Sequence, residues 1–313
     1  MASSLKVIHI VGAGRSGSTV FDTVLGNADD IESVGELCNA PQALLSTQEY
    51  CACGSLAHCC EFWCEVMAVW KELTEGADLG DLIKLQRSFI GKWQIPRLIF
   101  SRLFKTNSFI RYQAMESALY NAIARVSGHS VIVDSSKNPM RAYALSNVQG
   151  IDTLFIHLVR DGRGIAWSLK KAFEKKPEDG VQSYIASKPI WRTSLFWVAM
   201  NLLTELLLSG AKRAGKLIRV RYEDFTAQPS HSLSCIQEFA AIRLDAVISI
   251  LEQGEEMAVG HTVAGNRARM AGALKLRPDH GWKQALCAKD LRVFWWIAGP
   301  MAKRYGYQRR VDL

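Results

Sequence analysis

The residues best suited to bind a ligand stand near the start of the chain, in a loop of small residues. The apolar, β-branched run Val7–Val11 predicts a buried strand, and the apolar residues from Val20 onward have helical spacing. Between them, Gly12–Thr19 has the sequence GAGRSGST. A glycine-rich loop between a strand and a helix directs backbone N–H groups and the helix N-terminus towards an anion. We therefore expect a phosphate or sulfate group to bind at this loop; a plain turn without a ligand is the alternative.

The loop nearly matches the P-loop pattern of nucleotide-binding enzymes, G-x-x-x-x-G-K-[ST], but departs from it at one position. Ser18 stands where that pattern has the lysine that contacts the β- and γ-phosphates. The cation of the loop is instead Arg15, whose planar guanidinium can bind two oxygens of one phosphate or sulfate group. This difference weakens the hypothesis of a kinase or nucleoside triphosphatase, which we keep as the alternative function.

A second candidate anion site follows Thr153–Val159, which predicts another buried strand. The chain continues as Arg160-Asp161-Gly162-Arg163 and reaches Ser168 within the next predicted helix. Two arginines and a hydroxyl at the start of a helix could bind a phosphate, and Asp161 can cap that helix. An Arg–Asp pair is also common as a surface ion pair, so this motif alone does not decide between the two.

Together, the two motifs resemble those of the PAPS-dependent sulfotransferases, in particular the bacterial members and the tyrosylprotein sulfotransferases. In that family a loop R/K-S-G-[ST]-T follows the first strand, and an Arg and a Ser eight residues apart follow a later one, as Arg160 and Ser168 do here. The resemblance spans most of the chain and implies that 3′-phosphoadenosine 5′-phosphosulfate (PAPS) and its product PAP bind here, with Arg160 and Ser168 on the 3′-phosphate. The residues implied for the 5′-phosphosulfate end are Gly14, Arg15, Ser16, Gly17, Ser18 and Thr19.

Three further segments resemble motifs of the same family. Val131–Lys137 places a lysine just after a predicted strand, as the family's D-[KS]-[ST]-K segment does. Arg221–Asp224 resembles a motif whose tyrosine lies near the adenine and the 3′-phosphate. The segment beginning at His261 resembles the H-x-x-x-G-N-x-x-R segment of bacterial members, and its alternative is a polar loop without a ligand. The cofactor-binding residues that these segments add are Tyr222, Asn266, Arg269 and, as a competing arginine, Arg267.

Sulfuryl transfer in line between two oxygens needs a base for the acceptor's proton and cations for the developing charge. We predict Glu36 as this base, because its Gly-Glu pair follows the extended run Ile31–Val34 and should lie beside the loop. Tyrosylprotein sulfotransferases carry a similar pair, whose Glu acts as the base. His261 is the rival base, since an imidazole titrates near neutral pH. Arg15 and Lys137 are predicted to stabilise the leaving oxygen of the 5′-phosphate, and this chemistry requires no metal ion.

Six of the eight cysteines fall within residues 38–64. Cys51-x-Cys53, Cys59 or Cys60, and Cys64 could supply four thiolates to a structural zinc ion. Their spacing is not a standard C-x₂-C pair, and it resembles a C-x-C-G…C-x-x-W segment of bacterial sulfotransferases. We therefore predict reduced or locally paired thiols that shape a loop, and no metal ligand.

Predicted strands alternate with predicted helices, which indicates a parallel sheet covered by helices on both faces. With the family resemblance, we predict a single domain over residues 1–313 with a three-layer α/β/α fold and a central parallel sheet, as in P-loop NTPases. Two segments interrupt the alternation: a cysteine-rich insert at about 38–64, and a basic, aromatic stretch at about 82–112. The second is predicted to form a helical lid, over an acceptor pocket or touching a membrane surface, or simply solvated helices. The predicted strands are Val7–Val11, Ser130–Val133, Thr153–Val159 and Leu217–Val220, and the predicted helices include Tyr112–Val126, Arg163–Lys175 and Trp191–Ala214.

The composition limits the classes of partner without naming one. The chain has 38 basic and 30 acidic residues and a formal charge of +8, which suits a polyanionic ligand, a nucleic acid or an anionic membrane surface. No basic run or aromatic-spaced basic repeat supports nucleic-acid binding, and we find no signal peptide and no apolar stretch of about 20 residues. We expect a cytoplasmic enzyme with a small-molecule, carbohydrate or lipid acceptor, its oligomeric state left open. A nucleotide-sensing or nucleic-acid-binding module without catalysis is the alternative from another class.

Overall fold

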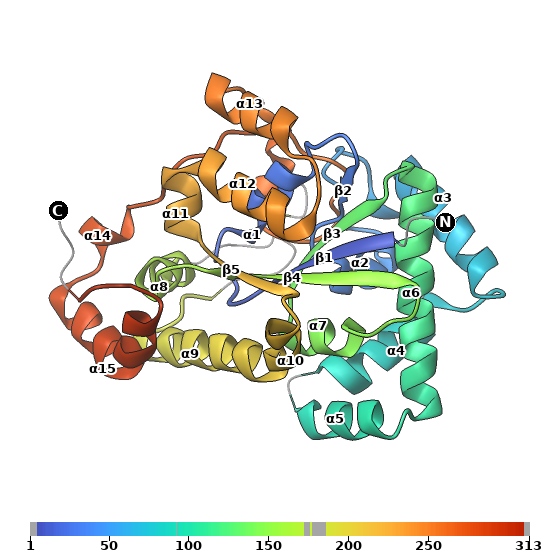
Figure 1. Ribbon diagram of the computed structural model, residues 1–313, viewed down its shortest axis with the longest axis horizontal. Helices are drawn as coiled ribbons and strands as arrows, with labels where there is room; N and C mark the ends of the chain where they lie inside the picture. Colours follow the sequence, from blue (N-terminus) through green and yellow to red (C-terminus); the bar gives the residue numbers. More distant parts are fainter. Residues whose placement is uncertain (1–4, 92, 172–175, 177–185, 310–313) are drawn as a thin grey trace.

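The central element of the molecule is a five-stranded parallel sheet with the strand order β2-β3-β1-β4-β5 (Figure 1). This computed structural model describes residues 5–91, 93–171, 176 and 186–309. β1 pairs with β3 on one side and with β4 on the other, so the loop after β1 starts at the middle of the sheet edge. The predicted α/β fold with a central parallel sheet is confirmed. The strands of the sheet are β1 (Leu5–Val11), β2 (Ile31–Ser33), β3 (Val131–Lys137), β4 (Ile151–Val159) and β5 (Leu217–Arg221).

Helices cover both faces of the sheet, because successive strand residues point to opposite sides. The α-helices of the described residues are α1 (Ser18–Leu25), α2 (Ala40–Leu45), α3 (Glu61–Leu73), α4 (Leu79–Ile90), α5 (Ile95–Leu103), α6 (Asn107–Ser127), α7 (Pro139–Leu145), α8 (Gly162–Lys170), α9 (Ile190–Leu207), α10 (Ser209–Arg213), α11 (Tyr222–Ala227), α12 (Pro229–Ala240), α13 (Asp245–Gln253), α14 (Trp282–Ala285) and α15 (Ala288–Arg304). On one face, Ile8 and Ile10 of β1 share a core with α1, α11, α12 and α13. On the other face, Val7 shares a core with α2, α3, α4, α6 and α7. Figure 1 shows α1, α11, α12 and α13 above the sheet and α7, α9 and α10 below it.

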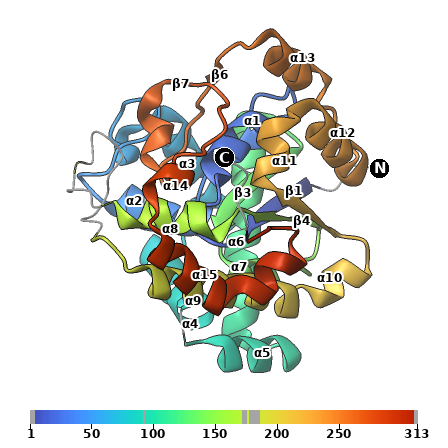
Figure 2. The same cartoon turned by 90° about the vertical axis from the view of Figure 1, so that its left-hand side faces the viewer.

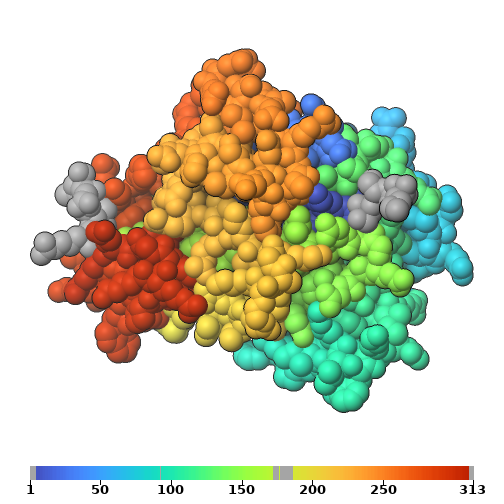
Figure 3. Space-filling model, viewed as in Figure 1, coloured from blue at the N-terminus to red at the C-terminus, as the bar shows by residue number. Residues whose placement is uncertain are grey.

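The carboxyl end of β4 leads directly into α8, which brings the C-terminal part of the chain to this edge of the sheet. α8 packs against α14 and α15, and the three helices lie together on the side that faces the viewer in Figure 2. In the space-filling view the blue atoms of the N-terminal segment show only in a small area between the orange and green parts (Figure 3). This is expected because the first described element, β1, is the central strand of the sheet.

The four predicted strands are confirmed, with boundaries that move by a few residues, and the extended run at Ile31 is the fifth strand, β2. The single helix predicted over Trp191–Ala214 is wrong. It is two helices, α9 and α10, which meet at Leu208 because that side chain turns inward to pack against Val11 and Phe155. α8 ends at Lys170, before the predicted end at Lys175, and residues 172–175 lie outside the described residues.

The basic, aromatic stretch at 82–112 forms α4, α5 and the start of α6. The end of α4 lies near the carboxyl end of β3, since Asn138 Nδ2 donates to the carbonyl O of Ile90 at 3.3 Å. α5 packs at the other end of α7, where Arg102 Nη1 donates to Ser146 Oγ at 2.7 Å. No helix among the described residues is long and apolar enough to cross a membrane. A role as lid or membrane contact stays a prediction, and Lys92 lies outside the described residues. Large apolar side chains of α5 exposed to solvent are Ile99, Phe100 and Leu103.

Candidate active site

The loop between β1 and α1 has the backbone of an anion-binding turn. Gly12 (φ 140°) lies so close to β4 that a Cβ there would be 2.5 Å from the carbonyl O of Leu158. Arg15 (φ 69°) and Gly17 (φ 89°) both adopt left-handed backbone, with one residue between them. Left-handed residues in such a turn point neighbouring backbone N–H groups towards one place, and α1 begins directly after the second of them. The predicted strand, loop and helix therefore have the geometry of an anion cradle.

The loop also holds a hydroxyl that is ready for a ligand. Ser16 is only 1% exposed, and its Oγ has no hydrogen-bond partner among the described residues. Leaving a buried polar group unpaired costs about 1–3 kcal/mol, so this position favours a ligand that offers it a partner. One turn further, Thr19 Oγ1 accepts a hydrogen bond from Asn266 N at 3.4 Å. The start of α1 therefore also borders the segment near residue 266.

Arg160, at the carboxyl end of β4, reaches the same loop. Its Nη1 donates to the carbonyl O of Arg15 at 3.1 Å, and its guanidinium carbon lies 4.6 Å from the centroid of the Tyr222 ring. Tyr222 in turn packs against Gly17, where a Cβ would lie 2.4 Å from the ring. Two motifs that are 145 residues apart in the sequence are therefore parts of one site.

Ser168 lies on the face of α8 that is turned towards Arg160. Gly164 is one turn earlier on the same face, and a Cβ there would be 3.2 Å from Arg160 Nε. Arg160 also forms an ion pair with Asp279, with 2.7 Å between Nη2 and Oδ2. Gly164 therefore lies next to Arg160, whose partner Asp279 is an acidic residue that the sequence analysis did not single out. That Arg160 and Ser168 bind one phosphate stays a prediction.

Arg163 does not join Arg160, contrary to the expectation of a clamp with two arginines. Its guanidinium pairs with Asp161 at 2.7 Å and lies 4.4 Å from the centroid of the Trp282 ring. Asp161 also caps α8, since its Oδ1 accepts from Arg163 N at 2.9 Å, as predicted. Arg163 is therefore paired with the residue that caps α8, and Arg160 is the arginine beside the loop.

Glu36 and Lys137 meet in an ion pair at the carboxyl ends of β2 and β3. Lys137 Nζ pairs with Glu36 Oε1, and Asn39 Nδ2 donates to the other carboxylate oxygen at 2.9 Å. Glu36 follows the left-handed Gly35 (φ 67°), at which a Cβ would be 2.2 Å from Thr262 Cγ2. Lys137 is itself left-handed, with φ 61°, which costs a residue with a side chain about 1–2 kcal/mol. Backbone strain of this kind gathers at functional sites.

A buried network fixes the two chain segments behind this pair. Asp134 Oδ1 in β3 accepts from Ser136 N at 2.9 Å, and Ser136 Oγ accepts from Cys38 N at 2.9 Å. Arg141 Nε donates to Asp134 Oδ2 at 3.0 Å. Burial alone would raise the pKa of Asp134, but the charges of Arg141 and His9, with hydrogen bonds from Ser136 and Tyr120, together outweigh it, and the pKa falls to about 2. The carboxylate therefore stays charged at neutral pH and holds the chain after β2 against the end of β3.

Gly265 and Asn266 lie beside the loop, as the sequence predicts. A Cβ at Gly265 would be 3.7 Å from Thr19 Oγ1 and 3.8 Å from Glu36 Oε1. Burial lowers the pKa of Arg15; Glu36 opposes this shift, and the charge of Arg267 adds to it. Arg15, Arg267 and Glu36 therefore act on one another electrostatically, and the excess of positive charge suits an anionic ligand.

Two of the predicted site residues, Arg269 and His261, are engaged elsewhere. Arg269 is 0% exposed, and its Nη2 donates to the carbonyl O of Tyr50 at 3.2 Å. Burial lowers the pKa of Arg269, and the charges of Glu49, Cys51 and Glu36 oppose this shift, so the guanidinium lies between the cysteine-rich insert and the candidate base. His261 Nδ1 lies 3.3 Å from Cys60 Sγ, so that nitrogen faces the cysteine-rich insert. The roles expected from sequence, a cofactor contact for Arg269 and a rival base for His261, stay predictions.

Comparison with solved structures relates this architecture to one group of enzymes. The crystal structure of sulfotransferase STF9 from Mycobacterium avium aligns with a TM-score of 0.50 at 14% identity, over 98% of this chain and 78% of that chain. This chain has the sulfotransferase fold. A sulfotransferase domain from the Synechococcus PCC 7002 olefin synthase aligns with a TM-score of 0.48 at 15% identity, over 97% and 95% of the two chains. Retinol dehydratase in complex with androsterone and inactive cofactor PAP aligns at 0.39 and 10% identity, over 97% and 82%.

No protein-family model and no curated protein matches the sequence. The sulfotransferase fold of this chain therefore emerges from the three-dimensional arrangement and from the short motifs, not from overall sequence similarity.

Within the sulfotransferase fold, sequence reasoning missed two residues that border the site. Asp279 stands in the stretch Pro278-Asp279-His280, which has no motif and no periodicity that could point to Arg160. Ser136 lies inside a motif that the sequence analysis did use. Its partner Cys38 is 98 residues away, so the contact follows only from the pairing of β2 with β3. Both omissions concern contacts between distant parts of the chain.

Proposed function

We propose that this protein is a PAPS-dependent sulfotransferase that moves a sulfuryl group to a hydroxyl or an amine of a small-molecule, carbohydrate or lipid acceptor. The observation that carries the proposal is the hydrogen bond from Arg160 to the carbonyl O of Arg15. It joins two cationic positions at the carboxyl ends of neighbouring strands, where the sheets of α/β proteins bind their ligands. A donor with phosphate groups on the 3′- and the 5′-oxygen of one ribose suits such a pair, and the sulfotransferase fold supports this choice.

The residues of the site fit PAPS in charge and in hydrogen-bonding capacity. The buried Ser16 Oγ, which has no partner among the described residues, would bond to an oxygen of the 5′-phosphosulfate together with Arg15 and the first backbone N–H groups of α1. Arg160 and Ser168 would hold the 3′-phosphate. Tyr222 connects the two positions, since its ring touches Gly17 and lies under Arg160.

In the proposed reaction, the bond between sulfur and the 5′-phosphate oxygen breaks while a new bond forms from sulfur to the acceptor atom. Glu36 takes the proton of the acceptor hydroxyl or amine. Lys137 and Arg15 stabilise the negative charge that develops on the leaving phosphate oxygen. The ion pair of Glu36 with Lys137 supports this division of roles, because it places a base and a cation side by side.

The alternative of a P-loop-like small-molecule kinase has less support. Its lysine position holds Ser18, and kinases need Mg²⁺ to bridge the β- and γ-phosphates of the nucleotide. A third possibility, a nucleotide-sensing module, would bind PAP with or without Glu36→Ala, and it is distinguished from the enzyme by the absence of turnover on any acceptor.

Calorimetry and a transfer assay test the proposal. PAP should bind at least about tenfold tighter than ATP, because only PAP carries a 3′-phosphate for Arg160, and a charge-assisted hydrogen bond is worth about 1.5–3 kcal/mol. Labelled PAPS should then transfer its sulfuryl group to at least one class of acceptor without added Mg²⁺. Tighter binding of ATP with Mg²⁺-dependent phosphoryl transfer would favour the kinase. PAP binding without turnover on any acceptor would favour the sensing module.

Two variants locate the 3′-phosphate. Arg160→Ala should weaken PAP binding by about 10- to 100-fold and Ser168→Ala by about tenfold, in line with the loss of one charged and one neutral hydrogen bond. Lys170→Ala is the matched control, since Lys170 is on α8 like Ser168 but is half exposed and paired with Asp290 at 2.9 Å. Equal effects of Lys170→Ala and Arg160→Ala would contradict the assignment.

We also propose that the enzyme works in the cytoplasm as a single domain. The eight cysteines, all among the described residues, are free. Free thiols in this number suit a reducing compartment, because oxidising compartments favour disulfides. Fractionation of the native cells, followed by immunoblotting, tests this location.

A further inference from the structure

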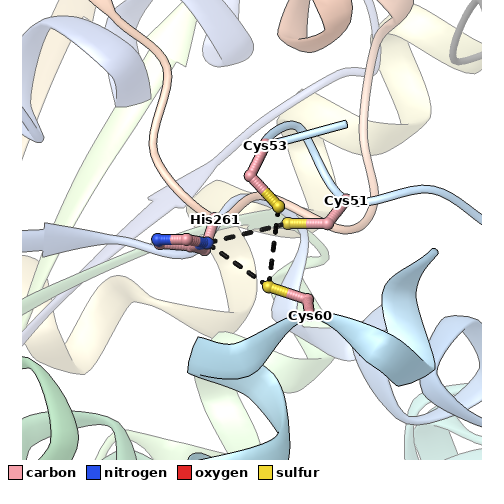
Figure 4. A group of neighbouring side chains, drawn as sticks. All are labelled: Cys51, Cys53, Cys60 and His261. Carbon is pink, nitrogen blue, oxygen red and sulfur yellow. Dashed lines mark hydrogen bonds between the residues drawn. The ribbon is translucent and has the colours of Figure 1, made fainter. Parts of the chain in front are cut away.

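Three cysteines and a histidine converge at one point of the cysteine-rich insert (Figure 4). Cys51 and Cys53 lie in a turn closed by a bridge between residues 50 and 56, and Cys60 directly precedes α3. His261 comes from the segment that follows the short strand β6 (Met257–Ala258). The three Sγ atoms and one ring nitrogen all lie within 4.8 Å of one another, and Figure 4 shows the sulfur atoms gathered beside the imidazole.

The distances within this cluster are those of ligands around one ion. Cys53 Sγ lies 3.7 Å from Cys60 Sγ, and His261 Nδ1 lies 3.3 Å from Cys60 Sγ and 4.0 Å from Cys51 Sγ. Tetrahedral zinc, with bonds of about 2.3 Å to sulfur and 2.0 Å to nitrogen, separates two sulfurs by about 3.8 Å and a sulfur from a nitrogen by about 3.5 Å. A disulfide would need its sulfurs at about 2.05 Å. The cluster therefore has the spacing of shared coordination, not of a covalent pair.

We propose that Cys51, Cys53, Cys60 and His261 bind one structural zinc ion. Three thiolates and an imidazole complete a four-coordinate set without a position for water, which is the pattern of structural zinc sites. Sulfur-rich tetrahedral sites also select against magnesium and calcium. This ligand set differs from the four-thiolate zinc site considered from the sequence, because it contains a histidine. It also differs from the predicted reduced or paired thiols, because three of the thiols bind a metal ion.

The two remaining cysteines of the predicted zinc set do not take part. Cys59 and Cys64 are exposed. Cys64 Sγ donates to the carbonyl O of His58 at 3.4 Å. They therefore provide matched controls within the same segment.

The surroundings hold the proposed ligands in place. Trp63 Nε1 donates to the carbonyl O of His261 at 2.6 Å, and the Phe62 ring stacks on the imidazole with 4.9 Å between centroids. Gly54 N donates to the carbonyl O of Cys51 at 3.0 Å, and its φ of 91° is a conformation that glycine adopts without strain. Such outer contacts orient metal ligands and contribute to affinity.

The ion would join the insert to the segment that borders the candidate active site. Ala52 N donates to the carbonyl O of Thr262 at 2.9 Å, and Glu36 N donates to the carbonyl O of Ala264 at 3.3 Å. The chain from His261 to Asn266 therefore leads from the cluster to the candidate base. Zinc binding would fix this segment against the loop after β1. The proposal itself depends only on the four ligands and not on the nature of the donor.

Metal analysis tests the site directly. Protein purified without chelators and freed of any affinity tag should contain about one zinc ion per chain by mass spectrometry of the elements. Cys53→Ser and His261→Gln should lower zinc affinity by more than about 100-fold in competition with a chromogenic chelator, because loss of an outer contact alone costs 10- to 100-fold. Cys59→Ser and Cys64→Ser should keep the affinity of the unsubstituted protein.

A second measurement covers the case in which a ligand variant fails to fold. The unsubstituted protein exchanged with Co²⁺ should show the visible bands of tetrahedral cobalt and the near-ultraviolet charge transfer of thiolate ligands. Zinc-loaded samples that retain less than about a tenth of an ion per chain, or a non-reducing mass map with a disulfide among Cys51, Cys53 and Cys60, would overturn the proposal. So would equal loss of zinc in Cys59→Ser and Cys53→Ser. None of these readouts depends on PAPS, so failure here and failure of the proposed function are distinguishable.

Discussion

The glycine loop at 12–19 and the segment at 261–269 meet beside Thr19 and Glu36, yet the protein holds them in different ways. The loop continues the central strand and is flanked by β3 and β4, with Gly12 against the carbonyl O of Leu158. No strand of the five-stranded sheet pairs with the described segment at 261–269, which packs against Gly35 and Glu36 just after β2. It is anchored by Trp63, by Ala52 and by the proposed zinc cluster. One border of the site therefore depends on the sheet and the other on a local cross-link.

The largest expected effect comes from the residue at which the two regions meet. Glu36→Gln should lower kcat by about 10²–10⁴, because it removes the proposed general base. PAP affinity should not weaken, since the variant leaves Lys137 and Arg15 in place. Steady-state kinetics and calorimetry check the two quantities separately.

Glu32→Gln is the control for this prediction, because Glu32 lies in β2 four residues earlier and pairs with His129 at 3.3 Å. A loss of kcat in Glu32→Gln equal to that in Glu36→Gln would show that any carboxylate near β2 matters, and would remove Glu36 from the mechanism.

Two glycines with nearly the same backbone compare the regions directly. Gly17 (φ 89°) and Gly54 (φ 91°) both need left-handed backbone, so alanine at either should cost about 1–2 kcal/mol in the free energy of unfolding. Only at Gly17 would the new Cβ also meet a neighbour, the Tyr222 ring at 2.4 Å, whereas the space at Gly54 is open. A displaced Tyr222 ring would disturb Arg160, which lies over it and whose charged contact with a phosphate is worth about 1.5–3 kcal/mol. Gly17→Ala should therefore weaken PAP binding by more than about tenfold, and Gly54→Ala by less than about threefold. Similar PAP affinities of the two variants would mean that Tyr222 does not order the loop.

Low pH should lower the free energy of unfolding, because a buried histidine lies next to the loop on the side of the site that the sheet holds. His157 in β4 pairs with Val11 in the sheet register, and burial lowers its pKa to about 4, although the hydrogen bond that its Nε2 donates to Asn201 Oδ1 opposes this shift. The folded state keeps this imidazole neutral. Its contribution is therefore complete above the unfolded pKa of about 6.5 and is lost as pH falls towards 4.

The measurement is the free energy of unfolding in urea at pH 7 and pH 4.5. From pH 7 to pH 4.5, the free energy of unfolding should fall by about 2–3 kcal/mol less in His157→Gln than in the unsubstituted protein. The difference between the two proteins is needed because burial raises the pKa of Asp22 to about 7, which acts in the opposite direction over the same range. An equal decrease in the free energy of unfolding of both proteins would contradict the role of His157.

The smallest expected effect concerns the ion pair beside the proposed 3′-phosphate position. Asp279 is about half exposed and pairs with Arg160 at 2.7 Å. Asp279→Asn should tighten PAP binding by about two- to fivefold, since an exposed pair contributes only about 0–1 kcal/mol and a nearby negative charge opposes a phosphate. Calorimetry at low and high salt measures this, and weaker binding in the variant would show that Asp279 supports Arg160 instead of competing for it.

The same contrast explains how much could be predicted from the sequence. The strands, the loop at 12–19 and the partnership of β4 with Arg160 depend on local patterns, because a strand and its following turn fix where the next side chain lies. Glu36 could be placed beside the loop for the same reason, since it follows an extended run. These predictions needed no knowledge of distant contacts.

What the sequence could not indicate are contacts between distant parts of the chain. His261 lies beside Cys60 although 201 residues of chain separate the two. Only the fold brings them together. Arg269 matched a motif position, yet burial against Tyr50 determines what its guanidinium contacts. The break between α9 and α10 depends on the inward packing of Leu208. No spacing within the sequence signals any of these.

The ion pair between Lys137 and Glu36 has a consequence for the order of events on this protein. While the two side chains are paired, each occupies the atom that the proposed reaction needs, Oε1 of the base and Nζ of the cation. In the proposed reaction, an arriving nucleotide would draw the ammonium towards its own negative oxygens and release the carboxylate. An acceptor that enters first would meet an idle base, so the nucleotide should bind before the acceptor.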